Sequence, residues 1–337
     1  MHILSIETSC DETAVAVTKN GRQVLSSEIS SQVEMHRIYG GVVPELASRR
    51  HIQVITPLAE IALEKSGITR AGIDAVAVTY APGLIGALLV GVNFAKSAAL
   101  TLDVPLIPVH HIRGHIAANY IAYPELTPPF LALVVSGGHS LLVDVRGYTD
   151  MKIIGTTRDD AAGECFDKTA RVLGLGYPGG PAIDALAKNG DEKKYALPVS
   201  KINDSPFDMS FSGLKTAVIN LVHNSAQSGN PVDREGLAAS ICRAISDTLV
   251  PRAISACKSL GYSKICCSGG VAANSVIRRD LSTAAAENNL EIYLAPLSLC
   301  SDNAAMIGCQ GYYEYLSGNR ADSSLNAYAT MPVDKLV

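Results

Sequence analysis

The sequence has little surplus charge of either sign. Its 337 residues carry 28 Lys and Arg against 32 Asp and Glu, which gives a formal charge of −4, and only 18% of the residues are charged. Such a chain has no general attraction for phosphate backbones, so a nucleic-acid substrate would need a local basic patch or a partner protein. Hydrophobic residues make up 47% of the chain. This composition favours a chain that is folded nearly throughout, most simply as two domains.

The eight cysteines form no C-x-x-C pair and no regular spacing. This excludes a disulfide framework or a zinc ribbon and favours a reducing, cytoplasmic setting. The N-terminal stretch carries Glu7, Asp11 and Glu12 where a signal peptide needs an apolar core. The longest apolar run, GLIGALLVGV, is about half the length of a membrane span. We therefore expect a soluble cytoplasmic protein with no membrane partner.

Turn signals and hydrophobic periodicity predict the same order of elements twice. The first half begins with three strands in a hairpin meander that turns at Asn20-Gly21, and helices then alternate with strands. The second half begins again with strand, glycine turn and strand in FLALVVSGGHSLLVDV. Helices are predicted over about 44–65, 84–100, 111–122, 212–224, 235–260 and 302–316.

This order predicts an α/β fold with two duplicated domains, each a mixed sheet flanked by helices. It is the plan of the actin, hexokinase and Hsp70 superfamily, in which nucleotide lies in an interdomain cleft. The expected first domain comprises residues 1–125 and 300–337, and the second comprises 126–299. Two doubly wound domains without that kinship are the alternative.

Glycine-rich turns follow strands at SGGH (136–139), GYPGGP (176–181) and SGGVAAN (268–274). Glycine lets the backbone approach a ligand closely, and successive N–H groups at such turns hold phosphate oxygens. Each loop alone could simply need a positive φ. Because the chain has neither a Walker lysine motif nor G-x-G-x-x-G, the three loops together favour an actin-like nucleotide site.

The segment TRDDAAGECFDK places Asp159, Asp160, Glu164 and Asp167 at the entry and first turns of a predicted helix. Acids here complement the helix dipole, so capping and a solvated face are one interpretation. The functional interpretation is that Asp167 accepts hydrogen bonds from ribose hydroxyls or amine donors.

The first turn of the chain, IETSCDET, holds Glu7, Asp11 and Glu12. In an actin-like fold this turn faces the nucleotide phosphates, so an acid there can orient water, a metal or a nucleophile. A polar turn that only closes a hairpin is the alternative. On the first long helix, Arg49, Arg50 and His51 form a small basic spot that is usually no more than a solvated face.

Three histidines stand within six positions, in VHHIRGH. His111 and His115 are four apart on a predicted helix and share a face, while His110 must point elsewhere. No glutamate follows the first histidine, which excludes an HExxH peptidase site. A third ligand is expected from Asp302, which could cap the last helix or bind the ion. Two imidazoles and a carboxylate suit zinc or ferrous iron, against the alternative of surface or core histidines.

Together these motifs closely resemble the tRNA adenosine threonylcarbamoyltransferase family along essentially the whole chain. Departures such as Ser301 and Cys165 touch no proposed ligand. The motifs that carry the resemblance are SIETSCDET, GGVVPELASRRH, PGLIGALLVG, PVHHIRGH, LVVSGGHS, DDAAGECFDK, LGLGYPGGP, MSFSGLK, SGGVAAN and CSDNAAMI.

The resemblance implies roles for individual residues. One divalent metal ion, iron or zinc, would be held by His111, His115 and Asp302, and Asp11 would be needed for activity. The adenylate substrate would lie against one loop and four further positions, namely Val134, Val135, Ser136, Gly137 and Gly138, and then Asp167, Gly180, Asp184 and Asn274.

The implied reaction transfers threonylcarbamoyl from threonylcarbamoyl-AMP to the exocyclic amine of the adenosine next to the anticodon, in tRNAs reading codons that begin with A. The implied partners are tRNA, a smaller non-catalytic paralogue and a P-loop ATPase. The alternatives are an ATP-dependent kinase of the same superfamily, which needs no His-x-x-x-His pair, and a non-catalytic scaffold paralogue. A metallopeptidase would need a general base that HIRGH does not provide.

Overall fold

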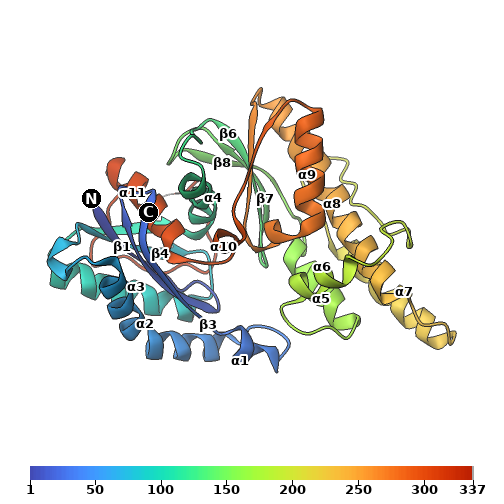
Figure 1. The fold of residues 1–337 in the computed structure, drawn as a ribbon, viewed down its shortest axis with the longest axis horizontal. Helices are drawn as coiled ribbons and strands as arrows, with labels where there is room; N and C mark the ends of the chain where they lie inside the picture. The colour runs from blue at the N-terminus through green and yellow to red at the C-terminus, as the bar shows by residue number, and fades with distance from the viewer. Residues whose placement is uncertain (336–337) are drawn as a thin grey trace. The chain divides into compact units, whose positions relative to one another are not determined.

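A computed structural model describes residues 1–335 of the chain. Two compact units share these residues, and each contains one five-stranded sheet (Figure 1). The first unit comprises Met1–Pro128, Arg146–Lys152 and the chain from Ala295 onward, and the second comprises Pro129–Val145 and Ile153–Leu294.

The sheet of the first unit has the order β3-β2-β1-β4-β5. Its central strand β1 pairs antiparallel with β2 and parallel with β4, so that Leu4 lies opposite both Val17 and Val76. Every residue of β4 is buried, which explains its continuous apolar sequence. The strands are β1 (His2–Glu7), β2 (Glu12–Lys19), β3 (Gln23–Ser31), β4 (Ala75–Ala81) and β5 (Leu106–His110).

The sheet of the second unit has the order β10-β9-β6-β7-β8. Its central strand β6 pairs antiparallel with β7 and parallel with β9, as β1 does with β2 and β4. The predicted duplication of a mixed sheet is therefore confirmed. The strands are β6 (Phe130–Val135), β7 (Ser140–Val145), β8 (Met151–Thr156), β9 (Lys264–Ser268) and β10 (Glu291–Leu294).

Helices cover both faces of the first sheet because its buried strands alternate their side chains between two apolar layers. On β4, Val76 and Val78 pack with Leu88 of α3. Ala77, between them, packs toward Ile307 of α11 on the other face. Figure 1 shows α2 and α3 on one side of β1 and β4, with α11 on the other.

The helices of the first unit are α1 (Val33–Arg37), α2 (Pro44–Ser66), the 3₁₀ turn η1 (Arg70–Gly72), α3 (Ile85–Leu102), α4 (His111–Ala122), α10 (Leu297–Cys300) and α11 (Ala304–Leu316). As predicted, α2 ends at a glycine: Gly67 adopts a φ of 69°, which an L side chain rarely does. Helix α2 runs through Pro57 without being divided.

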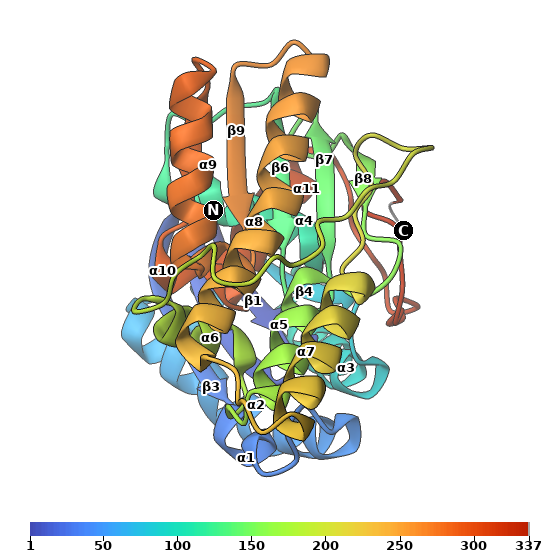
Figure 2. The ribbon, with the colours of Figure 1, turned by 90° about the vertical axis from the view of Figure 1, so that its right-hand side faces the viewer.

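The helices of the second unit are α5 (Ala162–Val172), α6 (Gly179–Ala187), α7 (Ser212–Gln227), α8 (Arg234–Ser259), the 3₁₀ turn η2 (Gly270–Ala273) and α9 (Ser275–Glu287). Figure 2 shows α8 and α9 running alongside strands β9 and β6 of this sheet. The glycine-rich turn predicted at 176–181 overlaps the start of α6, for which the sequence predicted no helix. Proline is tolerated in the first turn of a helix, where its missing N–H is not needed.

By length and composition alone, α3 could cross a membrane, a test that core helices of soluble proteins also meet. Its Leu88, Val92 and Ala95 are buried in the core of the first unit. Close packing explains why glycines stand at two positions in and next to this apolar helix. A Cβ on Gly83 would lie 2.5 Å from the carbonyl oxygen of Ser9, and one on Gly91 would overlap the Thr8 hydroxyl. These glycines let α3 approach the turn between β1 and β2.

Candidate metal centre and ligand-binding loops

The chain changes from strand to helix within the histidine cluster. His110 ends β5 and caps α4, since its Nδ1 accepts a hydrogen bond from the Ile112 N–H at 3.2 Å. Its Nε2 lies 3.0 Å from the Met331 carbonyl oxygen. His110 is thus held by the backbone, which leaves His111 and His115 on successive turns of one helix face.

The structure brings His111, His115 and Asp302 together in the first unit, with their ligand atoms all within 4.8 Å of one another. Asp302 Oδ1 lies 3.2 Å from His115 Nε2 and 3.6 Å from His111 Nε2. For a tetrahedral ion with bonds of about 2.1 Å, neighbouring ligand atoms stand about 3.4 Å apart. The two distances from Asp302 are therefore close to the spacing of metal ligands.

The burial of His115 supports the same interpretation. Its side chain is 0% exposed, and neither ring nitrogen has a hydrogen-bond partner within residues 1–335. A buried polar atom without a partner is costly, and coordination through Nε2 would remove part of that cost. Three protein ligands also leave coordination positions open, as catalytic zinc and ferrous iron sites do.

Asp302 reaches the histidines because it does not cap α11. The sequence left capping as one of its two roles, but the cap is Asn303, whose Oδ1 accepts from the Met306 N–H at 2.9 Å. Gly114, between the two histidines, lies against Ile307, where a Cβ would stand 2.7 Å from its Cδ1. The glycine allows α4 and α11 to approach closely.

Glu7, one of the three acids that the sequence places at the end of the first strand, is a neighbour of this group. It is the last residue of β1 and is 0% exposed. Its Oε2 lies 3.1 Å from His111 Nδ1 and accepts from the Thr79 hydroxyl at 2.5 Å. The sequence left open whether this acid acts at a ligand site or only closes a polar turn, and the only signal of its burial is the apolar strand that it ends.

The charges of this group shift the pKa values of His111 and Glu7 in opposite directions. Burial acts to lower the pKa of His111, but the carboxylates of Asp302 and Glu7 outweigh it and raise that pKa to about 9. Burial acts to raise the pKa of Glu7, but the charge and hydrogen bond of His111 hold it below its usual range. The two carboxylates that favour the charged form of His111 would equally favour a cation bound beside it.

Asp11 lies in the turn after β1 and is 6% exposed. Its carboxylate adds to burial in raising the pKa of Cys10. Burial, with the charges of Asp302 and Asp11, raises the pKa of Glu12 to about 9. Asp11 is thus in an acidic, mostly buried part of the first unit, and its catalytic role stays a prediction.

The expected basic spot on α2 is only partly correct. Arg49 is exposed and pairs with Glu45 at 2.7 Å. His51, in contrast, is 0% exposed, with Nδ1 2.7 Å from the Thr13 hydroxyl and Nε2 2.9 Å from the Cys10 carbonyl oxygen. His51 faces the sheet because it lies on the inner face of the amphipathic helix, with Ala47 and Ile55.

In the second unit, the predicted glycine loops meet at the carboxyl ends of two parallel strands. Strands β6 and β9 pair so that Val134 lies opposite Ser268. The loop that follows β9 contacts the end of β6, since a Cβ on Gly269 would overlap the backbone of Val135. The start of α5 approaches the same place, where the Gly163 N–H donates to the Ser136 carbonyl oxygen at 3.2 Å.

Several of these glycines have open space where a side chain would stand. A Cβ on Gly137, Gly138 or Gly180 would have no atom within 4 Å. Asp167 on α5 holds the start of α6, because its Oδ1 accepts from the Gly179 N–H at 2.7 Å. The geometry is that of exposed backbone on a rigid support, which suits a ligand that is held by N–H groups.

Asp184 and Asn274 meet at the start of α9. Asp184 Oδ1 accepts from the Ser275 N–H at 2.9 Å and from its hydroxyl at 2.7 Å. The Asn274 Oδ1 caps α9 by accepting from the N–H groups of Val276 and Ile277, each at 3.1 Å. Both side chains therefore have structural partners, and their contact with substrate stays a prediction.

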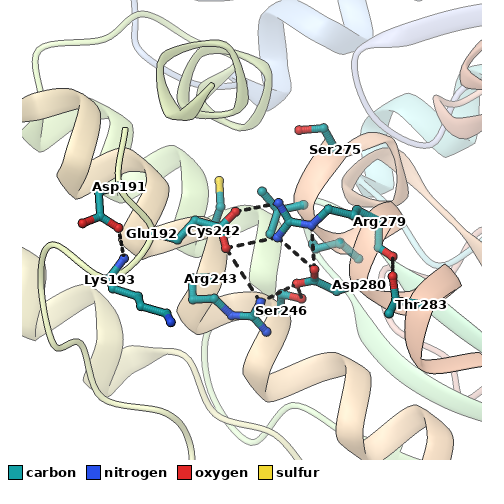
Figure 3. Close-up of polar contacts among 12 residues, drawn as sticks. Asp191, Glu192, Lys193, Cys242, Arg243, Ser246, Ser275, Arg279, Asp280 and Thr283 are labelled. Atoms are coloured by element: carbon teal, nitrogen blue, oxygen red, sulfur yellow. Dashed lines mark hydrogen bonds and ion pairs between the residues drawn. The ribbon is translucent and has the colours of Figure 1, made fainter. Parts of the chain in front are cut away.

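A network of ion pairs holds α9 against α8 (Figure 3). Arg279 binds both Glu192 oxygens, at 2.7 and 3.0 Å. Asp280 lies 3.0 Å from Arg243 and accepts from the Ser246 hydroxyl at 2.6 Å. The network gives the start of α9, with Asn274 and Ser275, a fixed support.

The acids at 159 and 160 have structural partners as well, although not the expected ones. Asp159 caps α7 instead of α5, since it accepts from the Phe211 N–H at 2.8 Å and the Ser212 hydroxyl at 2.6 Å. Asp160 lies between two lysines, 3.0 Å from Lys168 and 2.6 Å from Lys215. The sequence could not show this cap because the acid and the helix are about fifty positions apart.

Comparison with solved structures defines the class of the fold. The chain is similar to HypF from T. kodakarensis, with a TM-score of 0.62 and 16% identity over 96% of this chain and 49% of that one. It is also similar to a ROK family glucokinase from Streptomyces griseus, with a TM-score of 0.50 and 11% identity over 94% and 99% of the two chains. The fold is the duplicated α/β fold of the actin and hexokinase superfamily.

Sequence comparison defines the family. Residues 23–309 match the family model described as tRNA N6-adenosine threonylcarbamoyltransferase. Relatives of that name include proteins of Clostridioides difficile, 49% identical over 98% of both chains, and Moorella thermoacetica, 50% identical over 99% of this chain and 97% of the other. The chain belongs to the tRNA N6-adenosine threonylcarbamoyltransferase family, and the predicted family is confirmed.

Proposed function

We propose that the chain transfers a threonylcarbamoyl group from threonylcarbamoyl-AMP to the exocyclic amine of an adenosine in tRNA. A bond forms between that nitrogen and the carbamoyl carbon, the bond from this carbon to the AMP phosphate oxygen breaks, and the nitrogen loses a proton. Membership of an acyltransferase family supports the reaction class. The grouping of His111, His115 and Asp302 supports a metal at its centre, as do the buried ring nitrogens of His115, which make no hydrogen bond within residues 1–335.

In this proposal His111, His115 and Asp302 hold one divalent ion, either iron or zinc. When bound, the ion supplies a Lewis acid for the oxygens of the threonylcarbamoyl group. The chain's own contribution is to fix two ligands on α4 and the third in the turn before α11, and to bury both histidines. His115 is 0% exposed and His111 is 6% exposed.

The loops of the second unit would bind the adenylate. Ser136, Gly137 and Gly138 turn sharply between β6 and β7, with the Ser136 N–H donating to the His139 carbonyl oxygen at 2.8 Å. Open space at Gly137, Gly138 and Gly180 leaves room for a phosphate or ribose. Stabilising AMP as the leaving group lowers the barrier, because an adenine amine is a weak nucleophile.

Asp11 is proposed as the group that accepts the proton or orders a water for it. Buried acids near a reacting centre commonly serve as general bases, which contribute about 10²- to 10⁴-fold to rates. Asp11 is 6% exposed and lies in the same turn as Ser9, which contacts His111.

The formal charge of −4 leads to a proposal about partners. The adenosine would be the one next to the anticodon in tRNAs reading codons that begin with A. A smaller paralogue and a P-loop ATPase would help to hold the tRNA, in the cytoplasm. The chain alone is expected to bind tRNA weakly and with strong dependence on salt.

Reconstitution tests the proposal. Threonine, bicarbonate, ATP, the adenylate-forming enzyme, the partner proteins and unmodified tRNA are mixed with the chain, and the nucleosides are then analysed. We expect His111→Ala and Asp302→Ala to abolish the modified nucleoside while circular dichroism shows folded protein. Gly213→Ala, in open space on α7, is the control that should retain activity. Activity retained by either ligand variant would remove the metal from the mechanism.

A further inference from the structure

Glu7 is a fully buried carboxylate to which none of the roles above assigns a function. Its Oε1 accepts from the Ser9 N–H and its Oε2 from the Thr79 hydroxyl, both at 2.5 Å. In residues 1–335 it has no ion pair with a lysine or arginine, and its ionic partner is His111. A buried carboxylate needs such partners, so the position of Glu7 is fixed by β1, β4 and the turn that follows β1.

The Nδ1 atom of His111 has two polar neighbours that favour opposite tautomers. Glu7 Oε2 lies at 3.1 Å and Ser9 Oγ at 3.2 Å. A carboxylate only accepts, so in the neutral ring the bond to Glu7 requires the proton on Nδ1 and leaves a lone pair on Nε2. If the Ser9 hydroxyl donates to Nδ1 instead, the proton stands on Nε2. That second tautomer cannot bind a metal through the atom that faces Asp302.

We propose that Glu7 is a positioning residue that holds His111 in the Nδ1–H tautomer and so directs its Nε2 to the metal. The inference rests on the proposed metal at His111, His115 and Asp302. A carboxylate behind a ligating histidine fixes its ring and raises its basicity. His115 has no such partner within the described chain, because its Nδ1 is buried without a hydrogen bond. The two histidines are therefore unequal ligands, because Glu7 fixes the ring and tautomer of His111 only.

Zinc affinity tests this assignment without relying on activity. The dissociation constant is measured for the full chain by competition with a chromophoric chelator at pH 7. Glu7→Gln keeps the size of the side chain but removes its charge. We expect the dissociation constant to rise about 10- to 100-fold, as when such partners are removed elsewhere. Ser9→Ala removes the competing donor and should leave the affinity unchanged or slightly tighter.

Two controls separate this role from a general loss of buried contacts. Thr13→Val removes a polar partner from His51, a buried histidine outside the metal group, and should change the zinc affinity less than about twofold. In a His111→Ala background, Glu7→Gln should have no further effect on residual zinc binding. If Glu7 acted only through its charge, Glu7→Gln would still weaken zinc binding in the His111→Ala variant.

The tautomer itself can be observed in the wild-type chain, which keeps the test valid if Glu7→Gln does not fold. Nitrogen-15 NMR of labelled histidine in the zinc-loaded protein should show a proton on His111 Nδ1. A proton on Nε2, or a Glu7→Gln variant that binds zinc as tightly as the wild type, would overturn the assignment of Glu7. A wild-type chain that takes up no zinc or iron would instead overturn the proposed metal, and the role of Glu7 with it.

Discussion

The start of α5 at Gly163 lies directly against the backbone of Ser136. A Cβ on Gly163 would stand 2.5 Å from the Ser136 carbonyl oxygen and 2.7 Å from the Gly137 Cα. Backbone atoms cannot rotate away as the end of a side chain can. The glycine therefore fixes how closely α5 supports the loop that we propose for adenylate binding.

Gly163→Ala should displace this loop. We expect the free energy of unfolding to fall by about 1–3 kcal/mol, the usual cost of overpacking, and AMP to bind more weakly. Urea unfolding and calorimetric titration with AMP measure the two effects. The matched control is Gly213→Ala, also near the start of a helix, where a Cβ meets no atom within 4 Å. Equal behaviour of the two variants would show that the contact is unimportant.

Gly180→Ala should separate binding from stability. Its Cβ would stand in open space on α6, so the fold should be kept or stabilised slightly, by up to about 1 kcal/mol. If this space holds part of the adenylate, AMP affinity should fall at least tenfold in a calorimetric titration. An unchanged affinity would exclude Gly180 from the binding surface.

Asp159 should contribute stability that depends on pH. Burial acts to raise its pKa, but hydrogen bonds from Ser210, Ser212 and the Phe211 N–H outweigh it and hold the pKa below 3.8. A carboxyl group with a lowered pKa in the folded state stabilises the protein at pH values above its unfolded-state pKa. This stabilisation is lost as the pH falls through the folded-state pKa. Asp159→Asn should therefore lower the free energy of unfolding at pH 7. The difference from the wild type should shrink near pH 3, and urea titrations at the two pH values measure it.

A buried ion pair supports the metal helix from its other side. Arg113 lies 3.0 Å from Glu314, and both side chains are 1% exposed. Arg113 also donates to the carbonyl oxygens of Val333 and Thr149. Because breaking a buried pair leaves one charge unpaired, Arg113→Met should lower the unfolding free energy by about 3–5 kcal/mol. Asp150→Asn, which breaks the exposed pair with Arg146, should have a much smaller effect in the same denaturation assay.

The sequence could predict what depends on local spacing. His111 and His115 share a helix face because they are four positions apart, and the hairpin meanders follow from turn residues and alternation. The need for a third ligand pointed to Asp302 before the last predicted helix, and the family resemblance implied the same residue. Helix α6 was missed because Gly-Gly-Pro usually marks a turn.

What the sequence could not predict depends on packing between distant segments. Glu7 was expected at the end of the first strand, but its contact with His111 of α4, about a hundred positions away, was not. His51 looked like part of an exposed basic spot, but it lies on the inner face of α2 beside Thr13. No local pattern distinguishes these buried polar groups from solvated ones.

The most direct test of the account measures modified nucleoside as zinc or ferrous iron is returned to chelator-treated protein. The reconstituted system supplies threonylcarbamoyl-AMP, the partner proteins and tRNA, and the rate is followed against added metal. We expect no threonylcarbamoyladenosine from the metal-free chain and a rise that stops at one equivalent of metal per chain. Full activity of the metal-free chain would contradict the proposal that His111, His115 and Asp302 hold an ion that the transfer requires.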